Sequence, residues 1–466
     1  MVTADALAAL KSAVGEGGWT EDPAEIAPWL TEWRNRWTGH TPLMLTPRST
    51  EQVAAAVRVC CEHRIPLVTQ GGGTGLVGGQ IPHGEVLLST RKMRAVRDVT
   101  PLDDAMTVEA GVTLLEAQQA AAAADRMFPL SLAAEGSATI GGVVSTNAGG
   151  TAVLRYGVMR DLVLGLEAVL PNGEIFHGLK RLRKDNTGYD LKQLFIGAEG
   201  TLGVVTAATL KLFPVMRGRA TAMVGLDSPA AAIELLARAR AETGGGVEAF
   251  ELMKRLGMEF VLAHIPDTRE PLETTPPWYV LIELVSGDPA AAPAALERLL
   301  ADAFEAGLVT DAVVAQTDAQ RAALWKLREE QSAAQKPEGG GWKHDVSVPI
   351  SRIPAFLDET EAALQRFHPG ARISVFGHVG DGNLHYDVLR PPGENLPGFL
   401  ARWAEGSRLV HDIVARHDGS ISAEHGLGRL KTEEARRYKT PAEIAAMQSI
   451  RAALDPHRIM NPAVLF

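Results

Sequence analysis

Two histidines, His378 and His385, lie on either side of the sequence Val-Gly-Asp-Gly-Asn-Leu, a spacing that suits ligands of one metal ion. An Asp-Gly pair between short apolar stretches is a strong signal for a two-residue β-hairpin turn, because that turn requires positive φ angles. A turn centred on Asp381 and Gly382 pairs His378 with His385. Directly opposed side chains lie roughly 5 Å apart at Cβ. That separation allows two imidazoles to share one divalent metal.

A second pair of ionisable residues, Glu424 and His425, follows further along the chain. Carboxylates and imidazoles both bind divalent metals such as zinc, so Glu424 is a candidate third ligand. His425 would then stand beside the metal, where it can act as an acid or a base. Two histidines at this spacing also occur in ordinary hairpins. The pattern alone therefore leaves both interpretations open.

The composition is that of a globular protein long enough for two or three domains. The chain has 466 residues, of which 46% are hydrophobic and 22% are charged, and its net charge is −10. This charge argues against a nucleic-acid binder or a protein of anionic membrane surfaces. Neither a signal peptide nor a membrane span is expected, since no run approaches the length of about 18 apolar residues. The two cysteines, Cys60 and Cys61, are adjacent, which excludes a disulfide scaffold and fits a cytoplasmic protein.

Three glycine-rich segments predict a large bound cofactor; they are residues 71–79, 136–150 and 197–203. The first contains a G-x-G-x-x-G match, but Pro82, Gly84 and then a predicted strand follow it. The dinucleotide fingerprint requires a helix at that point, so we exclude a Rossmann site. Glycines after a strand still allow backbone N–H groups to approach an anion closely. One such loop is an ordinary turn, whereas three in one domain favour a long phosphate-containing cofactor.

The domain organisation follows from a break in the pattern after residue 214, where Pro214 to Arg219 ends one set of elements and begins another. Beyond the break, predicted strands and helices alternate, and this order is typical of sheets covered by helices. The predicted elements are strands at 220–226, 278–285 and 308–314 and helices at 230–241, 294–306 and 319–335.

Four sets of residues carry a resemblance to a known family; they are Gln70–Gly79, Gly136–Gly142 with Thr146–Gly150, Leu182–Gly203, and the C-terminal His378, His385, Glu424-His425 and Asn461-Pro462. Through these segments, and across nearly its whole length, the chain resembles the FAD-linked 2-hydroxyacid dehydrogenases of the vanillyl-alcohol oxidase / p-cresol methylhydroxylase flavoprotein group. Within that family it is most similar to the D-2-hydroxyglutarate dehydrogenases.

The resemblance implies an α+β fold with a two-subdomain FAD-binding domain of the p-cresol methylhydroxylase type, residues 1–214, completed by the tail at 426–466. Residues 215–425 would form a cap domain, with an antiparallel sheet flanked by helices, that carries the metal site. It also implies residues that bind FAD: Gly71, Gly72, Gly73, Thr74 and Gly75 at the pyrophosphate, Gly136, Ser137, Gly141 and Asn147 along the pyrophosphate and ring, Gly200 and Val205 near the adenosine, and Asn461 near the isoalloxazine. Some relatives attach FAD through a histidine in the first glycine loop. That loop has no His or Cys here, so we expect non-covalent FAD.

The chemistry implied is oxidation of a D-2-hydroxy acid, with D-2-hydroxyglutarate as the first candidate. A metal on the substrate hydroxyl lowers its pKa, and a neutral histidine can then accept the proton. We therefore expect zinc on His378, His385 and Glu424, and His425 as the base. FAD would accept the hydride.

The substrate carboxylate needs a cation, and Arg328 and Lys343 stand where family members clamp substrate. The planar guanidinium of Arg328 matches a carboxylate. Ser332, predicted one helical turn further on, stands where relatives carry Thr. Asp387 replaces the Asn of the hydroxyglutarate enzymes, and a carboxylate there should repel a dicarboxylate or need its own counter-charge. D-lactate and other short D-2-hydroxy acids therefore stay open as substrates.

The expected electron acceptor is an electron-transfer flavoprotein or a quinone, because no NAD site is found. Two other interpretations remain open at this point. One is a glycolate-oxidase-like enzyme that uses oxygen directly, and the other is a flavin-free metal-binding protein. The sequence leaves the assembly open, with a homodimer among the alternatives.

Overall fold

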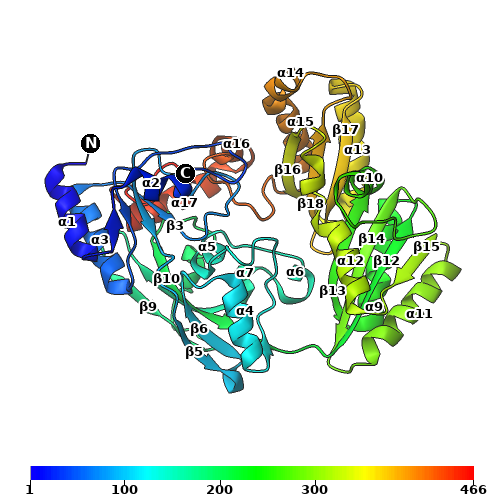
Figure 1. Cartoon of the computed structure of the whole chain (residues 1–466), viewed down its shortest axis with the longest axis horizontal. Helices are drawn as coiled ribbons and strands as arrows, with labels where there is room; N and C mark the ends of the chain where they lie inside the picture. The colour runs from blue at the N-terminus through cyan, green and yellow to red at the C-terminus, as the bar shows by residue number, and fades with distance from the viewer. Residues whose placement is uncertain (1, 466) are drawn as a thin grey trace. The chain divides into compact units, whose positions relative to one another are not determined.

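The computed structural model describes residues 2–465, which divide into two compact units (Figure 1). The first unit contains the chain up to Gly150, Tyr156–Val215 and the chain from Glu424 onward; the second contains Thr151–Arg155 and Met216–Ala423. The division predicted at residue 214 lies beside this boundary. Glu424 and His425, predicted in the cap, group with the first unit.

One sheet of the first unit has the strand order β1-β2-β4-β3. Its strands are β1 (Trp19–Thr20), β2 (Met44–Leu45), β4 (Val86–Ser89) and β3 (Leu67–Gln70). Helices α1 (Ala4–Val14) and α3 (Thr50–His63) pack together beside it around a core that includes Met460 from the tail. The Ser49 hydroxyl caps α3 by accepting the Gln52 N–H. Between β3 and β4 the described chain forms no helix, which confirms that the first glycine segment is not a Rossmann fingerprint.

The other main sheet of the first unit has the order β5-β6-β10-β8-β9, and all of its neighbouring strands are antiparallel. It contains a hairpin in which β8 (Val163–Val169) turns at Gly173 into β9 (Ile175–Gly178). The other strands are β5 (Val96–Thr100), β6 (Ala105–Glu109) and β10 (Val204–Lys211). The helices near this sheet are α4 (Leu114–Ala123), α5 (Ile140–Ser145), α7 (Met159–Leu162) and α8 (Lys192–Phe195).

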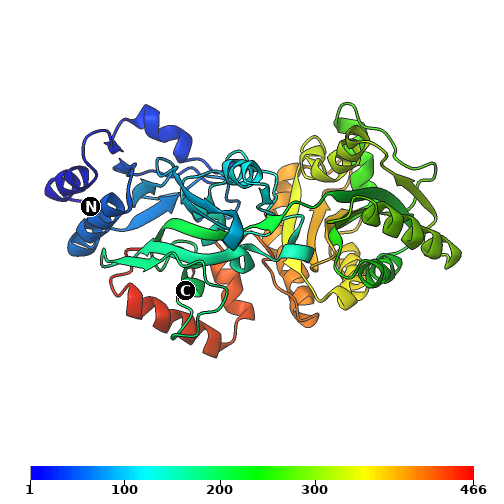
Figure 2. The same cartoon turned by 90° about the horizontal axis from the view of Figure 1, so that it is seen from below.

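The C-terminal tail groups with the first unit. Its helices are α16 (Thr432–Tyr438) and α17 (Pro441–Leu454), drawn in red beside the strands of that unit in Figure 2. The guanidinium of Arg451 is buried and donates to the carbonyls of Met460, Asn461 and Val464. The Asn461 N–H donates to the Leu67 carbonyl, so the tail is held against β3.

The second unit is built on an antiparallel sheet in the order β15-β12-β14-β13-β17-β18-β16. Its strands are β12 (Gly218–Leu226), β13 (Val247–Lys254), β14 (Trp278–Ser286), β15 (Asp311–Val314), β16 (Gly341–Ser347), β17 (Arg372–His378) and β18 (Asn383–Leu389). The expectation of an antiparallel sheet flanked by helices is confirmed.

Helices cover both faces of this sheet. On one face lie α9 (Pro229–Thr243), α11 (Ala291–Glu305), α13 (Ile353–Phe367) and α15 (Trp403–Arg416). On the other lie α10 (Arg255–His264), α12 (Asp318–Glu329) and the short 3₁₀ helix η3 (Ala333–Gln335), around a core that includes Met258, Trp325 and Phe376. The remaining short α-helices and strands of the two units are α2 (Pro23–Ile26), β7 (Arg126–Met127), α6 (Val153–Tyr156), β11 (Phe213–Pro214) and α14 (Leu396–Ala401).

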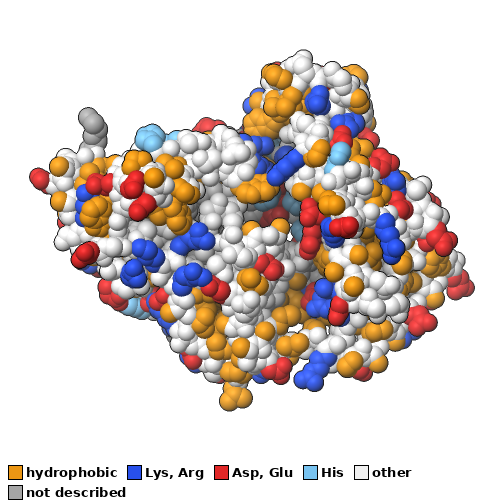
Figure 3. Space-filling view, viewed as in Figure 1, with side chains coloured by type: hydrophobic (Ala, Val, Ile, Leu, Met, Phe, Trp, Pro, Cys, Tyr) orange, Lys and Arg blue, Asp and Glu red, His pale blue; other side chains and the backbone are white. Residues whose placement is uncertain are grey.

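Acidic and basic side chains are interspersed over the face of the molecule drawn in Figure 3. None of the described helices combines the length and the apolarity that a membrane crossing requires.

Candidate functional site

A pocket in the first unit brings the three glycine segments together. We call it the glycine pocket. The predicted residues that line it are Gly71, Gly72, Gly73, Thr74, Gly75, Gly141, Gly200, Val205, Glu424, His425 and Asn461. Segments that are far apart in the sequence therefore form one continuous wall. Such convergence is expected of a site for an extended ligand.

Glycine is required in this wall because the loops approach each other closely. A Cβ on Gly72 would lie 2.0 Å from the Ser137 carbonyl oxygen, and one on Gly71 would lie 2.2 Å from Thr139 Oγ1. Gly73 and Gly200 have φ angles of 73° and 74°, which side-chain-bearing residues rarely adopt. The backbone itself thus forms the surface that a ligand would meet.

Two buried polar atoms point to a polar ligand in the glycine pocket. Thr139 Oγ1 and Asn461 Oδ1 have no hydrogen-bond partner among the described residues, and both residues line the pocket. The amide nitrogen of Asn461 donates to the carbonyls of Gly79 and Glu199 at 3.0 and 2.9 Å, so its orientation is fixed. Buried polar atoms are costly without partners, and a bound ligand that hydrogen-bonds to them would remove that cost. Thr139 and Asn461 therefore fit the predicted cofactor, FAD, which carries many polar groups.

Three of the predicted cofactor residues lie outside the lining formed by the described atoms. Ser137 stands behind Gly72 and presents its carbonyl to that loop. Gly136 precedes it. Asn147 has a φ of 51°, and its side chain accepts the Arg160 N–H at 2.8 Å, at the start of α7. The side-chain oxygen of Asn147 therefore binds the backbone of α7 and does not line the glycine pocket.

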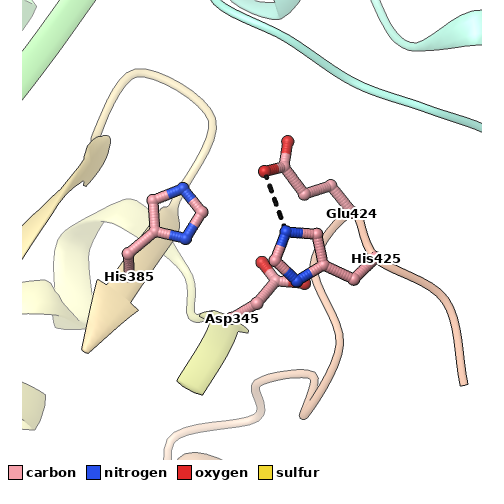
Figure 4. Close-up of side chains that lie close together, drawn as sticks. All are labelled: Asp345, His385, Glu424 and His425. Carbon is pink, nitrogen blue, oxygen red and sulfur yellow. Dashed lines mark ion pairs between the residues drawn. The ribbon is translucent and has the colours of Figure 1, made fainter. Parts of the chain in front are cut away.

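Glu424 and His425 lie in the wall of the glycine pocket, and Figure 4 shows their ion pair, with 3.6 Å between Glu424 Oε1 and His425 Nε2. The chain directly after them is anchored by Glu199, whose carboxylate accepts the N–H groups of Leu427 and Gly428 at 2.9 and 2.8 Å. Burial raises the pKa of Glu199, and these two hydrogen bonds and Lys431 only partly oppose the rise. Glu199 thus fixes the segment that carries His425.

The hairpin in the second unit has a different register from the predicted one. His385 on β18 lies opposite Phe376, and His378 lies opposite Glu251 on β13. The prediction of a two-residue turn was wrong, because the connection spans residues 379–382 and is closed by hydrogen bonds from Asp381 N to His378 O and from Gly382 N to Val379 O. The shift is two residues, which keeps both histidines on one face of the sheet. Their ring centroids are 6.1 Å apart.

Glu251, which the sequence analysis did not identify, connects two predicted site residues. It is fully buried, and its two oxygens each accept a hydrogen bond at 2.6 Å, one from His378 Nδ1 and one from Arg328 Nε. Burial raises the pKa of Glu251, but the neighbouring His378 and Arg328 outweigh this and lower it to about 2. The guanidinium of Arg328 also lies over the Phe376 ring at 5.1 Å.

The same face of the sheet carries two further cross-strand pairs. Asp345 lies opposite His385, and Lys343 lies opposite Asp387, on β16 and β18. Figure 4 shows Asp345 and His385 on these neighbouring strands, with ligand atoms within 4.8 Å of each other. Lys343 Nζ lies 2.8 Å from Asp387 and also donates to the Gln335 side chain. We call this surface the charged face; its residues are Glu251, Lys343, Asp345, His378, His385 and Asp387.

Ser332 does not continue the helix of Arg328. Helix α12 ends at Glu329, and Ser332 is an exposed residue at the start of η3. The predicted helix over 319–335 was too long, because Gln331 turns into the core, where its amide donates to the Leu327 carbonyl and closes the last turn. The prediction that Ser332 lies one helical turn beyond Arg328, on the same helix, is therefore wrong.

The residues that sequence reasoning missed are Thr139, Glu199, Glu251 and Asp345. Thr139 and Glu199 lie inside glycine segments that the sequence does identify. Asp345 alternates with Lys343 along one strand, a signal that would have found it once residues 341–347 were recognised as a strand. Glu251 lies between Phe250 and Leu252 in β13, far from any motif, and the sequence provides no signal for it.

Comparisons with known proteins agree with this geometry. Residues 41–178 match an FAD binding domain, and residues 215–465 match the C-terminal domain of FAD linked oxidases. The chain is 39% identical over 452 residues to a D-2-hydroxyglutarate dehydrogenase of Xanthomonas citri pv. viticola, covering 96% of this chain and 93% of that protein. It is 36% identical to a putative mitochondrial D-lactate dehydrogenase of Schizosaccharomyces pombe, covering 95% and 85%. The fold resembles p-cresol methylhydroxylase with bound substrate, with a TM-score of 0.77, 17% identity, and 99% and 96% coverage.

Proposed function

Because this chain belongs to the FAD-linked oxidase family, we propose that it oxidises a D-2-hydroxy acid to the 2-oxo acid, with D-2-hydroxyglutarate as the first candidate. The observation that carries the proposal is His425 in the wall of the glycine pocket. A histidine at the edge of a flavin site can take a proton from a substrate whose hydride leaves for the flavin.

FAD would be held by the backbone of Gly71 to Gly75, with Thr139 and Asn461 satisfied by its polar groups. When bound, the flavin supplies the acceptor for the hydride. The loop at 70–79 contains no histidine or cysteine, so we propose non-covalent binding. The remaining steps belong to side chains of the protein.

A divalent metal, with zinc as the preferred ion, would be held by His378, His385 and Glu424. Imidazoles and carboxylates are suitable zinc ligands, and the hydrogen bond from His378 Nδ1 to a carboxylate is the usual support for a metal-binding histidine. Glu424 is bonded to Ala423, whose N–H donates to the Asp345 carbonyl at 3.4 Å, so the chain passes this strand just before Glu424. Asp345 is a further carboxylate for the same ion. When bound, the metal supplies the positive charge that lowers the pKa of the substrate hydroxyl.

His425 would accept the hydroxyl proton on an imidazole nitrogen while the C–H bond breaks toward the flavin and the carbonyl forms. Glu424, 3.6 Å from His425 Nε2, would stabilise the imidazolium that results. The two electrons leave with the hydride, so the products are the 2-oxo acid and the reduced cofactor. Arg328 would bind the substrate carboxylate through its terminal nitrogens, and Lys343 is the other proposed contact.

The ion pair of Lys343 with Asp387 favours a second candidate substrate class. Because Asp387 neutralises Lys343, a second substrate carboxylate would meet a pair without net charge. D-lactate and other short D-2-hydroxy monocarboxylic acids have no second carboxylate and need no such cation. The similarity to a putative D-lactate dehydrogenase supports the same alternative.

An electron-transfer flavoprotein or a quinone is proposed as the electron acceptor, since the first glycine segment lacks the helix of an NAD site. Direct use of oxygen is the rival reading, and peroxide formation during turnover would reveal it. A colourless purified protein would instead support the flavin-free metal-binding protein. The proposed cytoplasmic location rests on the pair of free cysteines, Cys60 and Cys61.

The test is anaerobic bleaching of the oxidised flavin by a panel of D- and L-2-hydroxy acids. Rapid bleaching by D-2-hydroxyglutarate supports the first candidate, and bleaching by D-lactate alone supports the second. A yellow protein that none of the acids bleaches contradicts the proposal. His425→Ala should keep flavin and metal but slow bleaching by about 10²- to 10⁴-fold. The exposed His457, changed to Ala, is the matched control and should bleach at the normal rate.

Asp387→Asn separates the two substrate classes. Removing the carboxylate leaves the charge of Lys343 available to a second substrate carboxylate. The ratio of kcat/KM for D-2-hydroxyglutarate over D-lactate should rise about tenfold, which corresponds to roughly 1.4 kcal/mol. An unchanged ratio would show that this ion pair does not contact the distal end of the substrate.

A further inference from the structure

A single buried carboxylate, that of Glu251, contacts both a proposed metal ligand, His378, and the proposed substrate-binding residue Arg328. Glu251 is 0% exposed, and its partners, His378 and Arg328, are 9% and 7% exposed. The two hydrogen bonds, both 2.6 Å long, use different carboxylate oxygens. Neither partner can therefore rotate away without leaving a buried charge unsatisfied, which is strongly unfavourable.

The contact with His378 determines which nitrogen of its ring can bind a metal. A hydrogen bond from Nδ1 to a carboxylate holds the proton on Nδ1 and leaves the lone pair of a neutral imidazole on Nε2. His378 lies directly opposite Glu251 across β13 and β17, so backbone pairing fixes the approach of the two side chains. The ring then has one orientation, edge-on to His385, with an interplanar angle of 75°.

The contact with Arg328 fixes the guanidinium in a similar way. Glu251 binds Nε, and the two terminal nitrogens of Arg328 make no hydrogen bond with the described residues. The guanidinium plane also lies over Phe376, whose ring is 4.9 Å from that of His385. A guanidinium held at Nε presents its terminal nitrogens as a fork that matches a carboxylate.

We propose that Glu251 is a positioning residue that orients His378 toward the metal and Arg328 toward the substrate carboxylate. Metal affinity and recognition of the carboxylate then depend on the same buried charge. The inference rests on the proposed function in that His378 must bind the metal and Arg328 the substrate. It adds a residue that touches neither ligand yet controls both.

The test variant is Glu251→Gln, which keeps the size of the side chain and one carbonyl acceptor but removes the charge. Zinc affinity, measured by competition with a chromogenic chelator on the full-length flavoprotein without substrate, should fall by about 10- to 100-fold. In steady-state assays with the best acid of the panel, kcat should recover with excess zinc. KM should stay raised, because zinc cannot restore the orientation of Arg328.

A matched control exists on the same sheet. Glu283 is also buried, at 2% exposure, and its carboxylate also binds arginines, Arg219 and Arg321. None of its partners is a predicted site residue. Glu283→Gln should therefore leave zinc affinity and KM unchanged, even where it lowers stability as much as Glu251→Gln does. If Glu251→Gln fails to fold, Glu251→Asp keeps the charge but shortens the reach, and the same loss of zinc affinity is expected.

The outcomes separate this inference from the proposed function. A wild-type protein that oxidises a hydroxy acid and binds zinc, with a Glu251→Gln variant that matches the Glu283→Gln control, overturns the inference alone. A wild-type protein that binds no zinc and is bleached by no hydroxy acid overturns both. Loss of zinc affinity together with a raised KM that excess zinc does not correct supports the inference.

Discussion

The glycine pocket of the first unit and the charged face of the second unit are built from different parts of the chain. In the pocket, backbone atoms form the surface, as the contact between Gly72 and the Ser137 carbonyl illustrates. On the charged face, side chains from neighbouring strands meet in cross-strand pairs such as Lys343 with Asp387. A surface of backbone suits a large cofactor of fixed shape, whereas a surface of charged side chains suits the selection of a small ionic substrate.

Two glutamates repeat this difference on a smaller scale. Glu199 accepts backbone N–H groups, and burial raises its pKa. Glu251 accepts hydrogen bonds from two cationic side chains, which lower its pKa to about 2. Glu199 holds the segment that follows His425, and Glu251 holds His378 and Arg328. The comparison predicts that the glycine pocket tolerates the loss of a charge but not added side-chain volume. The charged face should tolerate added volume but not the loss of a charge.

The largest difference should appear when each carboxylate is removed. Glu251→Ala leaves a buried arginine and a histidine without their partner, a change that typically costs about 3–5 kcal/mol. Glu199→Ala leaves two backbone N–H groups without an acceptor, at about 1–3 kcal/mol for the group. Urea unfolding followed by circular dichroism measures both. Equal losses in the two variants would contradict the distinction between the regions.

The sequence predicts these two regions unequally well, and the reason is physical. A backbone surface requires glycine, so the pocket is visible as glycine segments even before the chain is folded. The charged face requires only that residues alternate along the right strands in the right register. The Asp-Gly pair suggested a register for His378 and His385 that is two residues from the observed one, because local turn preferences do not determine the length of the connection.

Glu251 shows where sequence reasoning ends. It lies between apolar residues in β13, more than a hundred residues from His378, and only the pairing of β13 with β17 brings the two together. Ser332 shows the complementary error. Its assignment assumed that the helical pattern around Arg328 continued, whereas burial of Gln331 ends the helix first. Tertiary contacts decided both cases.

Added side-chain volume should destabilise the glycine pocket more than the charged face. A methyl group on Gly72 would lie 2.0 Å from the Ser137 carbonyl oxygen, so Gly72→Ala must push two backbone loops apart. Such overpacking costs about 1–3 kcal/mol, and flavin affinity should fall by roughly 5- to 150-fold. Gly287→Ala is the control, because this exposed glycine belongs to the second unit and a Cβ there meets no described atom within 4 Å. Flavin fluorescence on dilution gives both dissociation constants, and a similar loss in the two variants would rule out the close approach of the loops as the cause.

The smallest predicted effect concerns the charge on Glu199. Because its folded-state pKa lies above the ordinary value of 4.5, the folded protein binds this proton more tightly than the unfolded chain does. Its contribution to the free energy of unfolding is therefore greatest below pH 4.5 and is lost as the pH rises through the folded-state pKa. The loss is about 1.4 kcal/mol for each unit by which the pKa is raised.

Glu199→Gln cannot lose this proton, so the stability of the wild type relative to the variant should decrease as the pH rises across that window. Urea unfolding of the two full-length proteins at a series of pH values measures the difference, in which other titrating groups cancel. A difference that stays constant with pH would mean that Glu199 has an ordinary pKa in the folded protein. A difference that grows with pH would mean that the two backbone hydrogen bonds outweigh burial, so that this backbone-bound carboxylate resembles Glu251 after all.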